Sequence, residues 1–187
     1  MKKLFITLIV LLGMQSSFAQ TKVGDVTLPG KKQYDSHELI LNGAGMREKL
    51  WFDLYAAGLY LNKKNKNASS IVSANEEMAI HMVIQSSILS NKKMIGALRD
   101  GFEETNSAAA IRKIQPKIET FISYLKDEIN VDDSYDIVYT PSSGSQLYKN
   151  GKLLGAIEGM DFKKALFNIW LANEPVDDDL KDNLLGN

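Results

Sequence analysis

The side chains that most often carry out chemistry are few in this sequence. It contains no cysteine and only two histidines, His37 and His81, among 187 residues. Disulfide bonds, thiolate metal sites and cysteine nucleophiles are therefore excluded, and so is a histidine-rich metal centre. We expect neither a metal nor another cofactor.

Motifs that would place a nucleophile or a phosphate are absent from the sequence as well. There is no Walker motif, no dinucleotide-binding glycine fingerprint and no nucleophile elbow. Gly43-Ala44-Gly45 precedes a predicted strand rather than a helix, so it lacks the context of a phosphate-binding loop. A serine triad would need His37 or His81, and the sequence around them supports neither. His81 is expected to be a partly buried strand histidine, and no catalytic residue is assigned.

Length and composition indicate one ordinary globular domain. The chain is 44% hydrophobic and 24% charged, and 187 residues can bury a substantial core. Its 22 Lys and Arg residues nearly balance 23 Asp and Glu residues, for a net charge of -1. This balance gives no electrostatic reason to expect a nucleic-acid partner.

Residues 1–19 have the pattern of a cleavable signal peptide. Lys2 and Lys3 precede an apolar run, and Ser17 and Ala19 supply small residues at the -3 and -1 positions of a cleavage site. The alternative is an N-terminal membrane anchor, but the apolar run is short for a span. We expect cleavage after Ala19, leaving a mature domain over 20–187 with no transmembrane segment. The expected location is a bacterial periplasm or the exterior of the cell.

The elements that must position any site follow from the periodicity of the apolar residues. Alternation predicts strands, including a central strand over 48–62 that is apolar on both faces, and a glycine-rich bend over 42–45 before it. The remaining strands are predicted over 22–28, 37–42, 78–85, 134–140, 146–149 and 152–157.

Helical spacing predicts a short helix near 69–74 and a helix from Ser90 to about Asn106. A further helical region covers residues 111–125, where Pro116 either kinks one helix or begins a new one. Two more helices are expected, one beginning at Asp161 and one at Asp177. Strands and helices are segregated along the chain, which favours an α+β fold with an antiparallel sheet.

Two stretches resemble the chalcone isomerase-like family. The first is NGAGMREKLWFDLYAAGLYL, at residues 42–61. The second, over 139–186, has a Tyr-x-Pro strand end, the hairpin LYKNGKLLGAIEG, the helix DFKKALFNIWL and a closing Pro-x-Asp-x-x-Leu segment. The resemblance implies an open-faced β-sandwich, in which a large antiparallel sheet carries a layer of helices with a cleft between them.

The resemblance also implies roles for two residues. Enzymes of this family use an Arg, a Thr, a Tyr and an Asn to close a chalcone to a flavanone. Arg47 matches the Arg, whereas Tyr55 stands at the Thr position, and the other two positions fall near Lys92 and Arg99. An Arg followed by this Tyr resembles the fatty-acid-binding members, where the pair holds a carboxylate. Arg47 and Tyr55 are therefore the candidate ligand-binding residues, although either can instead be structural.

Two functions of different classes follow from this resemblance. The first is a non-catalytic protein that binds a fatty acid or similar amphiphilic carboxylate. The alternative is an isomerase or lyase that acts on a planar enone-like substrate, with Arg47 stabilising an oxyanion. The missing Thr, Tyr and Asn count against the enzyme. The sequence leaves the oligomeric state, the ligand and any third, accessory role open.

Overall fold

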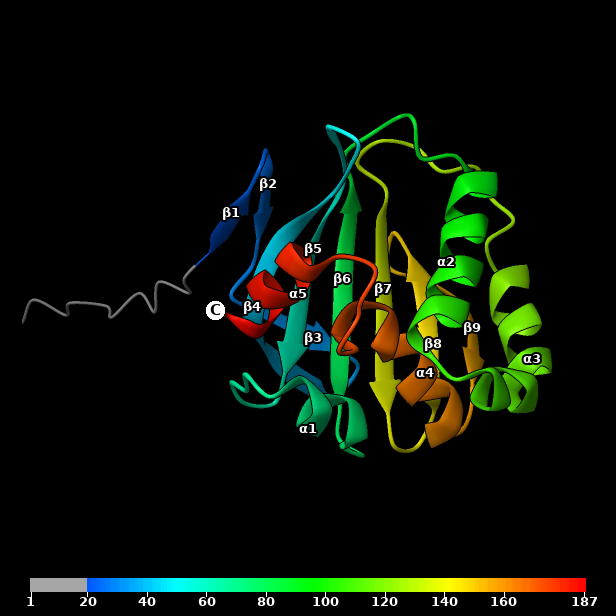
Figure 1. Ribbon diagram of the computed structural model, residues 1–187. Helices are drawn as coiled ribbons and strands as arrows, with labels where there is room; N and C mark the ends of the chain where they lie inside the picture. The colour runs from blue at the N-terminus through cyan, green and yellow to red at the C-terminus, as the bar shows by residue number, and fades with distance from the viewer. Residues whose placement is uncertain (1–19) are drawn as a thin grey trace, which may run out of the picture.

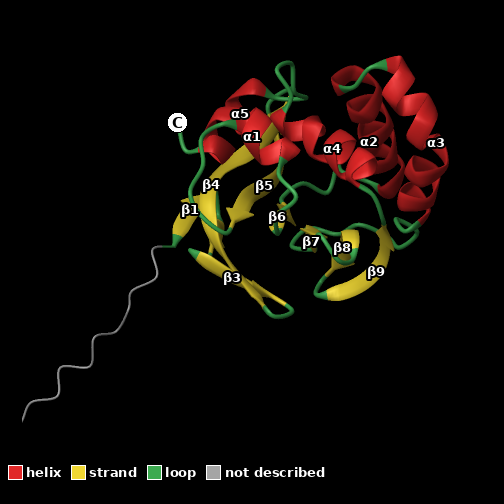
Figure 2. Ribbon diagram, turned by 90° about the horizontal axis from the view of Figure 1, so that it is seen from below, coloured by secondary structure: helices red, strands yellow, loops and turns green. Residues whose placement is uncertain are grey.

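A seven-stranded antiparallel sheet with all of its α-helices on one face forms the centre of the fold (Figures 1 and 2). The computed structural model describes residues 20–187, so the predicted signal peptide over 1–19 lies outside the described residues. The sheet strands are β3 (Lys31–Tyr34), β4 (His37–Lys49), β5 (Phe52–Leu61), β6 (Met78–Ile84), β7 (Ser134–Thr140), β8 (Gly144–Lys149) and β9 (Lys152–Ile157). They are hydrogen-bonded in chain order, so the sheet is a meander interrupted by helices.

The helices occur in the β5–β6 and β6–β7 connections and after β9. They are α1 (Ala68–Ser73), α2 (Asn91–Thr105), α3 (Ala108–Ser123), α4 (Met160–Leu171) and α5 (Asp178–Leu185). The large core lies between these helices and the sheet. No helix within the described residues is long and apolar enough to cross a membrane. The predicted α+β architecture, with a helix layer on an antiparallel sheet, is confirmed.

A smaller core covers the opposite face of the sheet. Leu39, Leu41 and Tyr60 pack there against Val23 and Leu28 of a separate hairpin, β1 (Thr21–Val23) and β2 (Val26–Leu28). The prediction of one strand over 22–28 is therefore wrong, because the chain reverses at Gly24, whose φ of +57° suits a glycine. The prediction that the central strand is covered on both sides is confirmed.

The glycine-rich segment predicted to bend is instead part of β4. Gly43 and Gly45 lie within the strand and face α5, and a Cβ on Gly43 would lie 2.1 Å from the carbonyl oxygen of Asn183. These glycines therefore permit the close approach of α5 to the sheet. The reversal falls at Leu50 and Trp51, whose φ angles are +49° and +72°, so β5 begins only at Phe52.

The helix predictions are confirmed in number, with adjustments at their ends. Ser90 caps α2 as predicted, and Asp177 caps α5. Pro116 lies inside the single helix α3. Gly159, not Asp161, is the N-cap of α4, and Asp161 instead lies in its first turn and accepts a hydrogen bond from Lys117.

Candidate functional site

An apolar cavity of about 310 Å³ lies between the helix layer and the sheet. This volume is at the lower end of the range for small-molecule sites. Five strands of the sheet and three helices line the cavity. Its apolar lining residues are Leu54, Met82, Leu89, Met94, Ala97, Leu98, Gly101, Phe121, Leu125, Ile137, Leu147, Ile169 and Val176. Its polar or amphipathic lining residues are Arg47, Lys49, Tyr55, Asp100, Glu104, Tyr135 and Trp170.

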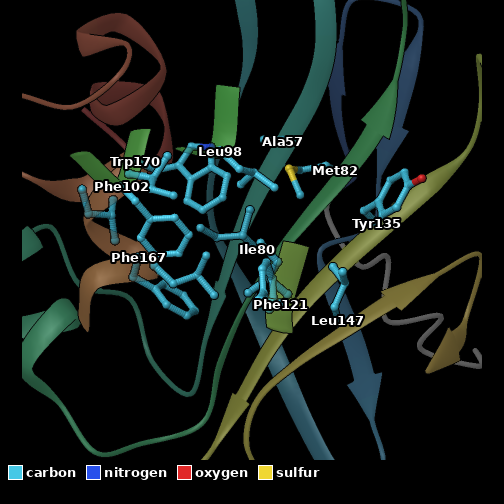
Figure 3. Packing of buried hydrophobic residues seen from close by; sticks show 14 of the residues in the cluster. Ala57, Ile80, Met82, Leu98, Phe102, Phe121, Tyr135, Leu147, Phe167 and Trp170 are labelled. Atoms are coloured by element: carbon cyan, nitrogen blue, oxygen red, sulfur yellow. The ribbon is translucent and has the colours of Figure 1, made fainter. Parts of the chain in front are cut away.

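Side chains from both the sheet and the helix layer enclose the cavity. Figure 3 shows Trp170 and Leu98 on one side of the packed cluster, Leu147 and Tyr135 on the other, and Met82 between them. All five residues line the cavity. Met82 of β6 and Met94 and Leu98 of α2 supply apolar side chains to the two facing walls of the cavity.

Arg47 and Tyr55, the two predicted site residues, lie together at the polar end of this cavity. They are directly paired across β4 and β5, and both line the cavity. A β-bulge next to Arg47 interrupts the regular pairing beyond it. The pairing follows from the hairpin register, since side chains opposite each other in an antiparallel pair point to the same face.

Asp177 is the counter-ion of Arg47. The Nη1 group of Arg47 donates to Oδ2 of Asp177 at 2.6 Å and to the carbonyl oxygen of Glu48 at 2.8 Å. Asp177 also caps α5, because its Oδ1 accepts a hydrogen bond from the backbone N–H of Leu180 at 2.9 Å. Both hydrogen bonds of the guanidinium to the described residues use one nitrogen, so Nη2 and Nε remain as donors for a ligand.

Tyr55 is buried and held by Trp170 of α4. The indole Nε1–H of Trp170 donates to the hydroxyl oxygen of Tyr55 at 3.0 Å. Burial raises the pKa of the Tyr55 phenol, an effect that outweighs the opposing influence of Trp170 and Arg47. The phenol therefore keeps its proton at neutral pH, and its O–H can donate to an acceptor in the cavity.

The other positions highlighted by the resemblance lie away from the cavity. Arg99 forms an exposed, two-pronged ion pair with Glu119 of α3, and Lys92 is exposed near the start of α2. Neither residue lines the cavity. The residues 20–187 contain no cluster of three His, Asp or Glu side chains placed to hold a metal ion.

His81 belongs to a separate polar cluster on the opposite face of the sheet. Its Nδ1 lies 2.8 Å from Oδ1 of Asp136 and 2.9 Å from Nζ of Lys32, and Tyr34 donates to the same Asp136 oxygen at 2.6 Å. His81 was expected to be a partly buried strand histidine, and it is in fact buried. This cluster ties β3 to β6 and β7.

Asp177 and Trp170 are the site residues that sequence reasoning did not identify. In the sequence, Asp177 was assigned only to a helix start, and Trp170 only to the helix DFKKALFNIWL. They are 130 and 115 positions from their partners along the chain. No local spacing in the sequence links these pairs, because the packing of α4 and α5 on the sheet brings them together.

Comparison with known proteins gives one family and one fold. The structure aligns with that of a fatty-acid binding protein from Arabidopsis thaliana at a TM-score of 0.70 and 17% sequence identity, over 86% of this chain and 92% of that one. At this identity the likeness concerns the fold. No curated protein sequence matches this chain. A family model described as chalcone isomerase-like matches residues 20–186, and the chain therefore belongs to the chalcone isomerase-like family.

Proposed function

We propose that this protein binds a fatty acid or a similar amphiphilic carboxylate, without converting it. The observation that carries the proposal is the juxtaposition of Arg47 and Tyr55 in the lining of an apolar cavity. An ionised head group and an alkyl chain need this combination of a cationic end and an apolar interior. A solved structure of the same fold is that of a fatty-acid binding protein, which supports the assignment.

The head group is held by three donor groups. Nη2 and Nε of Arg47 present two parallel N–H groups to a carboxylate, and the guanidinium supplies a permanent charge. The Tyr55 hydroxyl, oriented by Trp170, adds a third donor. The alkyl chain extends past Met82 and Leu98 toward Phe121 and Leu147, where it replaces water with apolar contacts.

The test is titration of a fluorescent fatty acid into the wild type and three variants. Arg47→Ala removes a charge-assisted interaction of roughly 1.5–3 kcal/mol, so affinity falls about tenfold to a hundredfold. Arg47→Lys recovers part of this, since an ammonium lacks the planar fork. Tyr55→Phe costs about 1 kcal/mol, the contribution of one neutral hydrogen bond.

Arg99→Ala is the matched control, because Arg99 is an ion-paired arginine outside the cavity. Equal affinity in the wild type and Arg47→Ala would contradict the proposal. Native mass spectrometry of the gently purified protein adds an independent readout, in which a bound acyl chain is expected. Rapid cyclisation of a hydroxylated chalcone that depends on Arg47 would favour the isomerase instead.

Export of the chain is part of the same proposal. It rests on the positive, apolar and small-residue regions of residues 1–19. Intact-mass analysis of protein recovered outside the bacterial cytoplasm is expected to give a mature chain that begins at Gln20. A mass that retains residues 1–19 would favour the membrane-anchor alternative.

A further inference from the structure

Most of the exposed large hydrophobic side chains gather at one end of the molecule. Within residues 20–187 these are Leu50, Trp51, Phe52, Ile88, Val131 and Leu153. Leu50 and Trp51 form the β4–β5 turn, and Ile88 and Val131 lie in the connections β6–α2 and α3–β7. Figure 1 shows this turn and both connections at the same end of the sheet, drawn at the top.

The turn residues Leu50, Trp51 and Phe52, here called the apolar tip, are the most unusual part of this end. Trp51 is 97% exposed and Leu50 is 76% exposed. Their positive φ angles are those of the two central residues of a type I′ turn, where Asn-Gly is preferred and large side chains are disfavoured. Two bulky apolar residues thus occupy a strained turn and bury almost nothing within the molecule. Such an outlier points to a role outside the fold.

The apolar tip adjoins the mouth of the cavity. Lys49 and Leu54, on either side of the tip, line the cavity, and so does Leu89, which follows the exposed Ile88. The exposed lining residues of α2, namely Ala97, Asp100 and Glu104, form the other side of this mouth. A surface that receives the tip therefore lies close to the route by which an amphiphile enters the cavity.

We propose that the apolar tip inserts into the surface of a lipid bilayer and thereby places the mouth of the cavity against that surface. This inference rests on the proposed function, since an amphiphilic ligand partitions into a bilayer. Tryptophan favours the interfacial zone of a membrane, where its ring is amphipathic. A three-residue tip suits insertion at this zone, whereas a stable protein interface needs about 20–30 residues on each side.

Charge identifies the kind of bilayer. The segment from Arg47 to Asp53 carries two positive and two negative side chains, and the mouth adds Asp100 and Glu104. With no excess of positive charge, contact depends on apolar insertion, so neutral phosphatidylcholine is the appropriate probe. Addition of anionic phosphatidylglycerol to the vesicles is not expected to strengthen binding.

The two tryptophans separate docking from ligand binding. Trp51 is exposed at the tip, whereas Trp170 is buried beside the cavity. Brominated phosphatidylcholine vesicles are expected to quench the Trp51 component of the tryptophan emission.

The double substitution Leu50→Asn with Trp51→Gly introduces a favoured turn pair, so thermal stability is expected to rise. Affinity for vesicles, measured by co-sedimentation, is expected to fall about a hundredfold, because two large apolar side chains are lost. Trp51→Phe keeps an apolar ring and most of the binding.

Reciprocal variants make the outcomes distinct. The tip double variant is expected to bind fatty acid like the wild type when no vesicles are present, whereas Arg47→Ala keeps vesicle binding and loses fatty acid. If Arg47→Ala binds fatty acid as tightly as the wild type while both bind vesicles, the proposed function is overturned and the docking proposal stands. Failure of the wild type to bind the vesicles, or equal binding by the tip double variant, would overturn the docking proposal. The docking proposal would also be overturned if the wild type sedimented as a dimer and the tip double variant as a monomer, because the tip would then contact a second copy of the chain.

Discussion

Arg47 meets two carboxylates in the proposed complex, that of Asp177 and that of the ligand. The Asp177 carboxylate lies 2.6 Å from Nη1 and therefore neutralises part of the charge that a ligand would use. Asp177→Asn removes this competition and keeps the helix cap, because Asn caps helices as well as Asp does. We predict that fatty-acid affinity rises about threefold to tenfold in a fluorescence titration.

Asp178→Asn is the control for this change, because Asp178 is exposed one residue further along the same helix turn. Its affinity is expected to match that of the wild type. A fall in affinity in Asp177→Asn would show that Asp177 positions the guanidinium rather than competing for it.

At the residue scale, the sequence predicted two of the four residues of the proposed site. The resemblance singled out Arg47 and Tyr55, and the hairpin register brings them together as directly paired residues. The partners that set their charge and orientation, Asp177 and Trp170, come from α5 and α4. Short-range periodicity assigns such residues to a cap or a core stripe, and only the tertiary packing gives them a second role.

At the scale of elements, the contact between β4 and α5 positions the Arg47–Asp177 pair. Gly43 has no side chain to hold β4 and α5 apart, and an added Cβ would also lie 2.6 Å from the carbonyl oxygen of Leu184. Gly43→Ala must therefore displace the α5 backbone. We predict a loss of about 2–4 kcal/mol in the free energy of unfolding, measured by urea denaturation, together with weaker fatty-acid binding.

Gly96→Ala is the control, and it is expected to change the free energy of unfolding in the opposite direction. A Cβ at Gly96, inside α2, meets no atom within 4 Å. Alanine is the better helix former, so the free energy of unfolding is expected to rise by up to about 1 kcal/mol. A Gly43→Ala variant as stable as the wild type would mean that α5 shifts freely, and the proposed link from β4 to the site would be lost.

The attachment of the edge strand β3 to the sheet through Asp136 is predicted to weaken in acid. Burial by itself would raise the pKa of the Asp136 carboxyl, but His81, Lys32 and Tyr34 together lower this pKa to about 2. Because the folded pKa lies below the unfolded value near 3.9, the stabilisation is complete above about pH 5 and is lost as the pH falls toward 2. This group contributes about 2 kcal/mol of stability at neutral pH.

Urea unfolding at intervals from pH 6 to pH 2 tests this contribution. Asp136→Asn is expected to be less stable at neutral pH and to show a shallower loss in acid than the wild type. Asp25→Asn, at the exposed β1–β2 turn, is expected to follow the wild-type curve. Parallel acid curves for the wild type and Asp136→Asn would place the acid sensitivity elsewhere.

The errors in predicting elements have a common physical cause. Glycines within residues 42–45 predicted a bend, because local sequence cannot distinguish a glycine required by φ from one required by a neighbouring helix. Leu50 and Trp51 did not signal a turn, because their types are disfavoured there. Helix caps such as Ser90 and Asp177, and the Asn150-Gly151 turn between β8 and β9, were predictable because their determinants are local.

At the scale of the whole molecule, the cavity lies inside the one large core that joins the sheet to the helices. Its lining includes β4 to β8 together with α2, α3 and α4, so the proposed ligand would contact most of the elements that separate on unfolding. Ligand binding and global stability are therefore coupled. A ligand that binds only the folded state adds to stability as its concentration exceeds the dissociation constant.

We predict that a fatty acid present at about one hundred times its dissociation constant stabilises the fold by about 2.7 kcal/mol, which raises the melting temperature by roughly 5–10 °C. Differential scanning calorimetry measures this shift.

At the same concentration, the alcohol of equal chain length is expected to give a smaller shift, because it has no charge to pair with Arg47. The tip double variant should retain the full shift, since its changes lie outside the cavity, whereas Arg47→Ala should lose most of it. Identical shifts for the acid and the alcohol would show that the alkyl chain alone is recognised and that Arg47 serves only to hold α5 through Asp177.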